Sequence, residues 1–389
     1  MLFIKNAKIL TMEGKDFDCA SILVENGKIS AIGEGLEAPS GVQVIDAAGK
    51  LVTPGLIDAH THLGVVGSAM RWEGDDCNEM TDPVTPHIRA LDAINPFDES
   101  FHDTIEAGVT TVATSPGSAN VICGQLAAMK TGGSKRADDL VIKAPLAIKC
   151  ALGENPKNVY GQLKKTAPMT RMGTAAIFRE TFMKTQEYID KKRNAEDGKN
   201  KKPDFNMKYE ALIPVLEREI PIHIHAHQAN DIHTAIRLIK EFNIRATIIH
   251  CTDAHLIIDD LVEAGLPTII GPTLGFKSKP EVAHKTFATA DALVKAGIKT
   301  CITTDHPVIP LQHLNVCAAL CVQAGMDEME ALKAITIYAA EVMGLEDRVG
   351  SLKAGKDADI VIWDKNPLDA TSHALYTIIE GKIVYRRSK

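Results

Sequence analysis

No stretch of this 389-residue sequence stays apolar for the roughly 18 residues that a helix needs to cross a bilayer. Residues Met1–Asn6 form a short strand pattern and lack the apolar core of a signal peptide. The eight cysteines include no Cys-x-x-Cys pair, and Cys317 and Cys321 fall on a predicted helix as buried free thiols. We therefore expect a soluble protein of the reducing cytoplasm.

An excess of positive charge is also missing. The 43 lysines and arginines are outnumbered by 50 aspartates and glutamates, which gives a net charge of −7 with neutral histidines. Such a balance favours solubility and provides no basic footprint for nucleic acid. We therefore expect a small-molecule substrate, with neither a nucleic-acid nor a membrane partner. The length allows one large α/β domain and a smaller domain beside it.

Both ends of the chain have strand patterns joined by tight turns. Asn26-Gly27 separates two apolar segments near the N-terminus, and Glu380-Gly381 does the same near the C-terminus. Because an isolated hairpin is only marginally stable, we expect the two ends to pair. Residues 1–54 and 345–389 are therefore predicted to build one small β-sandwich domain.

The middle of the chain alternates short apolar segments with longer helical patterns. Asp327 followed by Glu330 is a capping-box signature, and it predicts a helix over Asp327–Met343. Strands alternating with helices favour an α/β fold, here a (β/α)₈ TIM-type barrel over residues 55–344, whose chemistry lies at the strand C-termini. The eight predicted strands are Leu56–His62, Gly108–Thr114, Val121–Lys130, Ala144–Ala151, Pro221–His227, Ala246–Cys251, Pro267–Gly271 and Lys299–Asp305.

Histidines and an aspartate gather where these predicted strands end. Residues two apart on a strand point to the same face, so His60 and His62 project together from the first strand. The fifth strand repeats this alternation, the sixth ends on His250 and the last ends on Asp305. Two neutral imidazoles on one rigid element are half of a transition-metal site. Four of eight strands thus deliver a ligand type to one rim, which chance would seldom arrange.

With these motifs the sequence resembles the amidohydrolase superfamily of metal-dependent hydrolases. Pro-Gly-Leu-Ile-Asp-Ala-His-Thr-His at 54–62 is similar to its first-strand motif, and Gly350–Val361 is similar to its re-entry into the small β-domain. The resemblance covers essentially the whole chain and is closest to the imidazolonepropionase-like and Xaa-Pro dipeptidase-like branch. It implies one or two divalent ions, zinc or another metal, and these ligands: His60, His62, His225, His250 and Asp305.

The ligand that bridges two such ions is open between several residues. Ile148-Lys149 resembles the Ile-Lys of members in which carbon dioxide converts a lysine into a carbamate, an anion that can bridge two cations. An unmodified Lys149 would repel them, and a snorkelling or ion-paired lysine is the alternative. Glu154 is the rival carboxylate ligand. Glu180 is a weaker third choice, because Arg179-Glu180 fits an exposed helical face.

The resemblance implies that metal-activated water attacks an amide-type C–N bond. The metal would bring the pKa of bound water to about 7, Asp305 would carry the proton, and His250 would help the metal to polarise the substrate carbonyl. Where the superfamily's deaminases have a proton-shuttling glutamate, this chain has Gln228, which cannot exchange protons near neutral pH. We therefore favour hydrolysis of a dipeptide, an N-acyl amino acid or a cyclic amide. A mononuclear imidazolonepropionase-like or deaminase-type enzyme, and a non-catalytic scaffold of this family, are the alternatives.

Contacts with the substrate must come from residues at the strand ends and in the loops that follow them. The substrate-binding candidates are His227, His87, Tyr160 and Arg171, and for each a hydrogen-bonded structural role or a surface ion pair is the alternative. Asp58 shares its strand face with His60, so it either orients that imidazole or has a packing or capping role. The resemblance also raises the expectation of a homo-oligomer, which no residue pattern proves.

Overall fold

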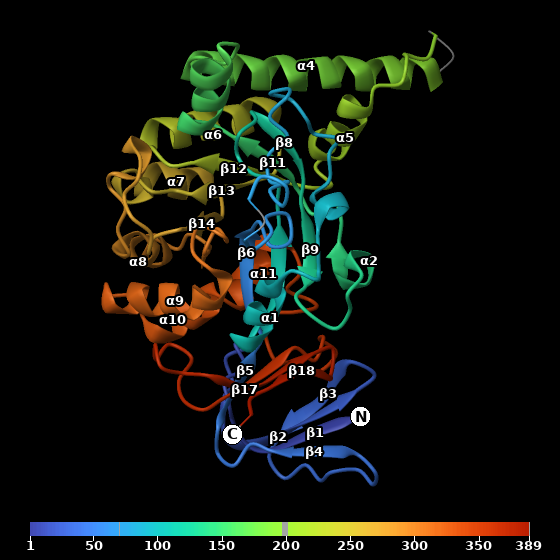
Figure 1. Ribbon diagram of the computed structural model, residues 1–389, viewed down its shortest axis with the longest axis vertical. Coiled ribbons are helices and arrows are strands. Elements are labelled where there is room, and N and C mark those ends of the chain that lie inside the picture. Colours follow the sequence, from blue (N-terminus) through green and yellow to red (C-terminus); the bar gives the residue numbers. More distant parts are fainter. Residues whose placement is uncertain (70, 197–200, 389) are drawn as a thin grey trace.

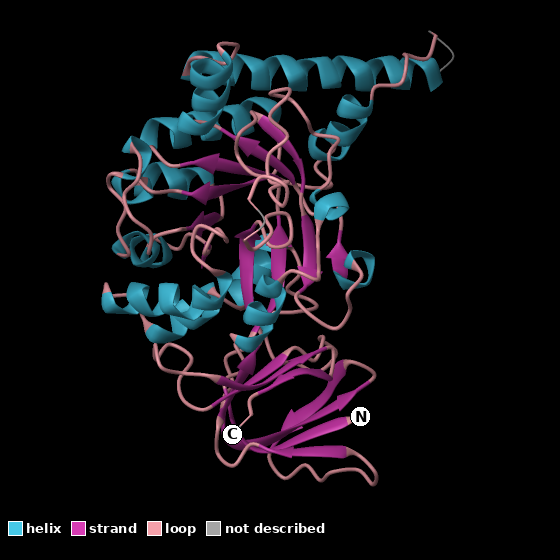
Figure 2. Cartoon of the chain, viewed as in Figure 1, coloured by secondary structure: helices cyan, strands magenta, loops and turns pink. Residues whose placement is uncertain are grey.

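The structure is a computed structural model that describes residues 1–69, 71–196 and 201–388. Strands from the two ends of the chain form a sheet at one end of the molecule, where both termini lie (Figure 1). A larger body of strands and helices lies above this sheet (Figure 2). None of the helices in the described ranges has the combined length and hydropathy that spanning a bilayer demands.

The terminal sheet has the strand order β18-β17-β16-β5-β1-β2-β3, with β4 beside β1. Asn26 and Gly27 join β2 to β3 with φ angles of 51° and 78°, as a two-residue hairpin turn requires. Strand β16 is antiparallel to β5, with Ile360 opposite Pro54, so the chain ends do pair as expected. Because the eight strands belong to one sheet, the expected β-sandwich is not confirmed. The strands are β1 (Leu2–Ile9), β2 (Phe17–Glu25), β3 (Lys28–Gly33), β4 (Gln43–Asp46), β5 (Leu51–Pro54), β16 (Ile360–Trp363), β17 (Ala374–Ile379) and β18 (Lys382–Arg386).

The body contains two further sheets, with the orders β10-β9-β7-β6 and β15-β14-β13-β12-β11-β8. Adjacent strands from β11 to β15 are parallel to one another, and β6 is parallel to β7. Each of the eight predicted segments contains at least one strand, which supports the predicted α/β fold. The strands are β6 (Leu56–Thr61), β7 (Val109–Thr114), β8 (Ile122–Gln125), β9 (Ala127–Lys130), β10 (Val141–Lys143), β11 (Ile148–Ala151), β12 (Ile222–Ala226), β13 (Ala246–His250), β14 (Thr268–Ile270) and β15 (Thr300–Ile302).

The expectation of eight uninterrupted parallel strands is wrong for the third segment, Val121–Lys130. It divides at Leu126 into β8, which is antiparallel to β11, and β9, which is antiparallel to β7. Only the seven residues 115–121 separate β7 from β8. A parallel return needs a crossover of about a dozen residues or more, so this connection is too short for one.

Helices cover the outer side of the parallel strands (Figures 1 and 2). The predicted cap is confirmed, because the Asp327 side chain accepts hydrogen bonds from the backbone N–H groups of Met329 and Glu330. The single predicted helix is wrong, since Thr336 leaves the helical conformation (φ −139°, ψ −98°) and separates α10 from α11. The helices are α1 (Glu99–Glu106), α2 (Ala137–Leu140), α3 (Glu154–Lys157), α4 (Arg171–Glu196), α5 (Met207–Leu216), α6 (Ala229–Phe242), α7 (Ile258–Ala264), α8 (Ala288–Lys295), α9 (Leu314–Gln323), α10 (Glu328–Ala334) and α11 (Ile337–Met343). Short turns complete the set: η1 (Ala90–Ala93), the π-helical η2 (Asn158–Lys164), η3 (Ala254–Leu256), η4 (Pro280–Val282) and η5 (Leu311–His313).

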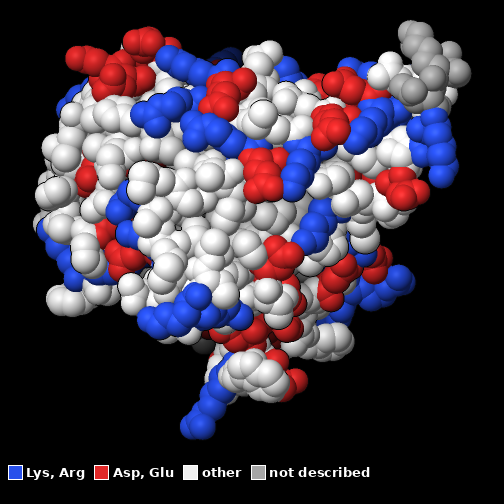
Figure 3. Space-filling view, turned by 90° about the horizontal axis from the view of Figure 1, so that it is seen from above, with Lys and Arg blue, Asp and Glu red and all other residues white. Residues whose placement is uncertain are grey.

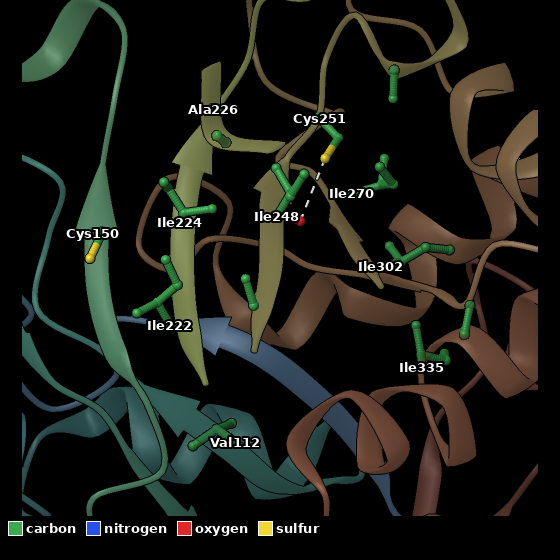
Figure 4. Close-up of a cluster of buried hydrophobic side chains, with 14 of the residues drawn as sticks. Val112, Cys150, Ile222, Ile224, Ala226, Ile248, Cys251, Ile270, Ile302 and Ile335 are labelled. Carbon is green, nitrogen blue, oxygen red and sulfur yellow. Dashed lines mark hydrogen bonds between the residues drawn. The ribbon is translucent and has the colours of Figure 1, made fainter. Parts of the chain in front are cut away.

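Side chains alternate along β12, so one face of the strand packs in the apolar core and the other carries His225. Ile222 and Ile224 belong to the buried apolar core, where Figure 4 shows them beside Ile248 of β13. His225 comes between Ile224 and Ala226, so it points to the opposite face. Core packing therefore fixes the strand and, through it, the direction of the histidine. The exposed surface around α4 shows interspersed acidic and basic side chains, in agreement with ion pairs such as Lys184–Glu180 (Figure 3).

A buried ion cluster joins the body to the terminal sheet, and it yields a stability prediction. Lys130 on β9, whose side chain is 4% exposed, lies 2.9 Å from Asp357 and 2.6 Å from Asp359. The Lys130→Met substitution would leave two buried carboxylates without this partner. We expect it to lower the free energy of unfolding by about 3 kcal/mol, measured by urea denaturation. The control Lys184→Met removes an exposed pair and should change it by less than about 0.5 kcal/mol. Equal losses in both variants would contradict the argument.

Candidate metal centre

One group of ligand types is delivered by β6 and by the segment that follows β15. The Nε2 atoms of His60 and His62 lie 3.2 and 3.3 Å from Asp305 Oδ1. Asp58 holds the two segments together: one carboxylate oxygen accepts the N–H of Thr304 at 2.8 Å, and the other accepts the backbone N–H of His60 at 3.1 Å. Asp58 thus binds the backbone of His60 rather than its imidazole, so the expected tautomer-holding role gives way to a structural one.

A second group comes from the neighbouring strands β12 and β13. Ring nitrogens of His225, His227 and His250 lie within 4.8 Å of one another. The structure therefore brings His227, which was expected to be a substrate contact, together with two expected ligands. His250 Nδ1 lies 2.7 Å from the carbonyl oxygen of Gly271. Because a carbonyl only accepts, Nδ1 carries the proton and Nε2 keeps its lone pair for a metal ion.

The two groups are neighbours, and Lys149 lies beside them. The ring centroids of His60 and His250 are 5.5 Å apart. Lys149 Nζ, which is fully buried, lies 3.0 Å from His60 Nε2. Neither Glu154 nor Glu180 belongs to the two groups that the described residues form. Glu180 lies on the exposed surface of α4, which excludes it as a bridging ligand.

Several buried polar atoms in this region have no hydrogen-bond partner among the described residues. They include both ring nitrogens of His225, Nδ1 of His60 and Oδ1 of Asp305. Buried polar atoms normally have partners, and a bound ion would supply one for Asp305 Oδ1 and for one ring nitrogen of His225. Imidazole nitrogens and a carboxylate are the donor set of Zn²⁺. In a tetrahedral site, bonds of about 2.0–2.1 Å separate neighbouring donor atoms by about 3.3 Å, which agrees with the separations around Asp305.

The backbone around two of these residues is strained. His250 and Asp305 have φ angles of 74° and 54°, in the left-handed region that residues other than glycine seldom adopt. Each such residue costs on the order of 1 kcal/mol. Strain of this kind clusters at functional sites, so its presence at two strand ends supports a functional placement of both side chains.

The electrostatic environment sets the protonation that a cation needs. Burial holds the pKa values of His225 and His250 below the ordinary 6.5, which keeps both rings neutral. Although burial opposes it, the neighbouring His250, His60 and His62 hold the pKa of Asp305 well below its usual range. His225 and His250 are therefore neutral and Asp305 is anionic at neutral pH, and these are the forms that bind metal.

His62 differs, and it yields a pH prediction. Burial lowers its pKa, but the Cys77 thiol and Asp305 beside it raise the pKa to about 10. A metal ion must displace this proton, so we expect the apparent zinc affinity to rise about tenfold per pH unit between pH 7 and 8. Calorimetry at pH 8 in two buffers of different ionisation enthalpy should find about one proton released per ion bound there. An affinity independent of pH would contradict the assignment.

The other expected substrate contacts lie outside the two groups. Tyr160 is buried and donates a hydrogen bond to Asn120 Oδ1 at 2.6 Å. Arg171 lies 2.8 Å from Asp231 and 2.5 Å from Gln228 Oε1, so its charge is already paired. His87 is half-buried in the long loop after β6. For these three residues, substrate binding stays a prediction.

Sequence reasoning missed Glu281, on the turn η4 after β14. Its carboxylate is buried, and Oε1 lies 3.5 Å from His225 Nε2 and 3.6 Å from His227 Nε2. No periodic pattern surrounds this residue, so the local sequence carries no signal for it. Cys77, beside His62, was missed for the same reason.

The profile of the amidohydrolase family matches residues 51–384. The chain belongs to the amidohydrolase family. Amidohydrolase tasK of Hapsidospora irregularis is 30% identical over 92% of this chain, which spans only 39% of that relative. An imidazolonepropionase of Treponema denticola is 24% identical, over 95% of this chain and 92% of the relative. A solved amidohydrolase from Thermotoga maritima MSB8 is 40% identical and superposes with a TM-score of 0.96 over 100% of both chains. The resemblance inferred from the motifs is therefore confirmed, and the fold is the TIM-barrel-like α/β fold of this family.

Proposed function

We propose that the protein is a metal-dependent hydrolase that cleaves an amide-type C–N bond in a dipeptide, an N-acyl amino acid or a cyclic amide. The observation that carries this proposal is the meeting of two buried groups of ligand types at the strand ends, with donor atoms left unpartnered. Two neighbouring groups favour a binuclear enzyme over a mononuclear one. The complete set of donors also speaks against a non-catalytic scaffold.

The chain's own residues supply the proton chemistry of this reaction. Zn²⁺ ions held by these residues would act as a Lewis acid and provide hydroxide near neutral pH. Asp305, anionic and at the site, orients the attacking water, accepts its proton and passes it to the leaving nitrogen. His250 donates its single ring proton to Gly271, so it cannot also donate to the substrate carbonyl. We therefore assign His250 a ligand role instead of the direct polarising role expected from the sequence.

The surroundings of Gln228 support amide hydrolysis over deamination. Its Oε1 accepts a hydrogen bond from Arg171 at 2.5 Å. A carboxamide in this position offers no exchangeable proton near neutral pH. The chain thus lacks, at this position, the proton shuttle that deamination of an aromatic amine needs.

We also propose that residues 55–344 form a closed catalytic barrel and that residues 1–54 and 345–389 form its companion domain. Closure is supported where β15 meets β6: Thr303 Oγ1 donates to the carbonyl oxygen of His60 at 2.6 Å. The His62 N–H donates to the carbonyl oxygen of His306 at 2.8 Å, beyond the same strand ends.

Lys149 fits the role of a carbamate that bridges the ions. Burial lowers the pKa of Lys149, which favours the neutral amine that can attack carbon dioxide. The amine nitrogen then bonds to the carbon of CO₂ and loses a proton to solvent. We expect added bicarbonate to raise the zinc content of the dialysed protein, measured by elemental analysis.

In Lys149→Met, zinc content should fall and should no longer respond to bicarbonate. The control Lys333→Met removes a lysine that is paired with Glu330 on α10, outside both groups of ligand types, and it should behave as the wild type. An unchanged metal content in Lys149→Met would rule out the bridging role.

A hydrolysis screen over dipeptides, N-acyl amino acids and lactams tests the proposed function. We expect turnover of one of these classes, its loss after chelation, and its return when zinc is added. Full activity of the metal-free protein, or no turnover of any class by the metal-loaded protein, would contradict the proposal.

A further inference from the structure

We propose that Glu281 is a ligand of the metal ion at His225, His227 and His250, which gives this position four protein ligands besides the proposed Lys149 bridge. The inference rests on the proposed function, because it needs a metal centre. It goes beyond the ligand set implied by the resemblance, which contains neither Glu281 nor His227.

The separations between the donor atoms carry this inference. Glu281 Oε1 lies 3.5 Å from His225 Nε2 and 3.6 Å from His227 Nε2. These values are close to the roughly 3.3 Å edge of a tetrahedral zinc site. They also resemble the 3.2 and 3.3 Å between Asp305 and its two histidines. Within the described residues, both ring nitrogens of His225 have no hydrogen-bond partner.

The carboxylate of Glu281 is held in this orientation from outside the histidine group. Its Oε2 accepts the backbone N–H of Glu154 at 3.0 Å, where α3 begins. Lys279 Nζ lies 2.5 Å from Oε1 and also donates to Asn155 Oδ1 at 2.9 Å. Partners of this kind orient a ligating carboxylate. A salt bridge to Lys279 alone would explain the buried charge, but it would leave His225 Nε2 without a bound partner, which a metal ion would supply.

This assignment gives the two metal positions different roles. Counted with the proposed Lys149 bridge, the His225 position would have five protein ligands and the His60 position would have four. The His225 position would then be the more fully occupied one. His60, His62 and Asp305 would hold the ion that binds the attacking water, and Asp305 is the residue that handles its proton.

The test measures metal content and affinity rather than turnover. Purified Glu281→Gln and wild-type protein are dialysed against buffered Zn²⁺, analysed for zinc, and titrated with a competing chelator. We expect two ions per wild-type chain. In Glu281→Gln one ion should keep the wild-type affinity, and the other should bind about 100-fold more weakly or worse, since even indirect partners of a ligand contribute 10- to 100-fold.

Two further variants locate the loss. The double variant His60→Ala/His62→Ala should bind one ion, and adding Glu281→Gln should remove it. Lys279→Met keeps the carboxylate and should keep two ions, whereas a loss there equal to that in Glu281→Gln would make the salt bridge the essential element and overturn the inference. Circular dichroism of each metal-free variant checks that it is folded.

The outcomes separate this inference from the proposed function. Two ions with wild-type affinity in Glu281→Gln would overturn the ligand role and leave the metal-dependent hydrolase intact. A wild-type protein with a single ion, lost in His60→Ala/His62→Ala, would also overturn it. A wild-type protein that binds no zinc would overturn the proposed function, and the ligand role with it.

Discussion

His60→Ala is expected to abolish metal-dependent hydrolysis while the protein stays folded. His60 is fully buried, and its Nε2 lies between Asp305 and Lys149, so it contacts both an expected ligand and the expected bridge. A metal ion contributes several kcal/mol of transition-state stabilisation, and each 1.4 kcal/mol is a factor of ten. We therefore expect kcat/KM to fall by roughly 1000-fold or more, measured on the substrate that the hydrolysis screen identifies.

The matched control for His60→Ala is His233→Ala. His233 is 42% exposed on α6 and pairs with Asp260 on the surface. Its removal should leave both kcat/KM and zinc content within twofold of the wild type. Full activity of His60→Ala after metal stripping and readdition would refute the ligand assignment.

The period of a strand explains which ligand positions could be predicted. His60 and His62 share one face of the first predicted strand, and His225 and His227 share one face of the fifth, because side chains alternate along a strand, and that rule needs no tertiary information. Predicting which of these residues lie next to one another does need tertiary information. His227 has the same parity as His225, and only the geometry of β12 against β13 brings its ring within 4.8 Å of those of His225 and His250.

Features that depend on connection length or on loop conformation could not be predicted from the sequence. The split of Val121–Lys130 follows from the short link before it, which leaves no room for a parallel crossover. Glu281 lies in an irregular connection, where no periodicity predicts which side chain turns inward. Its position follows from contacts with Glu154 and Lys279, residues whose own placement requires the whole fold. Ligands on strands with a periodic side-chain pattern could thus be predicted, and Glu281 in the irregular connection could not.

Asp305→Asn should separate the proton chemistry from metal binding. The amide keeps an oxygen donor of similar shape but cannot accept the proton of the attacking water. General acid–base catalysis contributes about 100- to 10,000-fold, so we expect kcat to fall by about 1000-fold with a smaller change in KM. Zinc content, measured on the same samples, should stay above one ion per chain, because the histidine ligands remain.

The control Asp260→Asn changes an exposed carboxylate that pairs with His233, and it should leave kcat unchanged. Its comparison with Asp305→Asn distinguishes two readings of the carboxylate at the end of β15. A variant that loses kcat and keeps its zinc supports a base that also positions water. If Asp305→Asn instead loses zinc and regains wild-type kcat at saturating metal, Asp305 is a ligand only. The proton must then leave through another group, and the mechanism derived from the Asp305 geometry would fall.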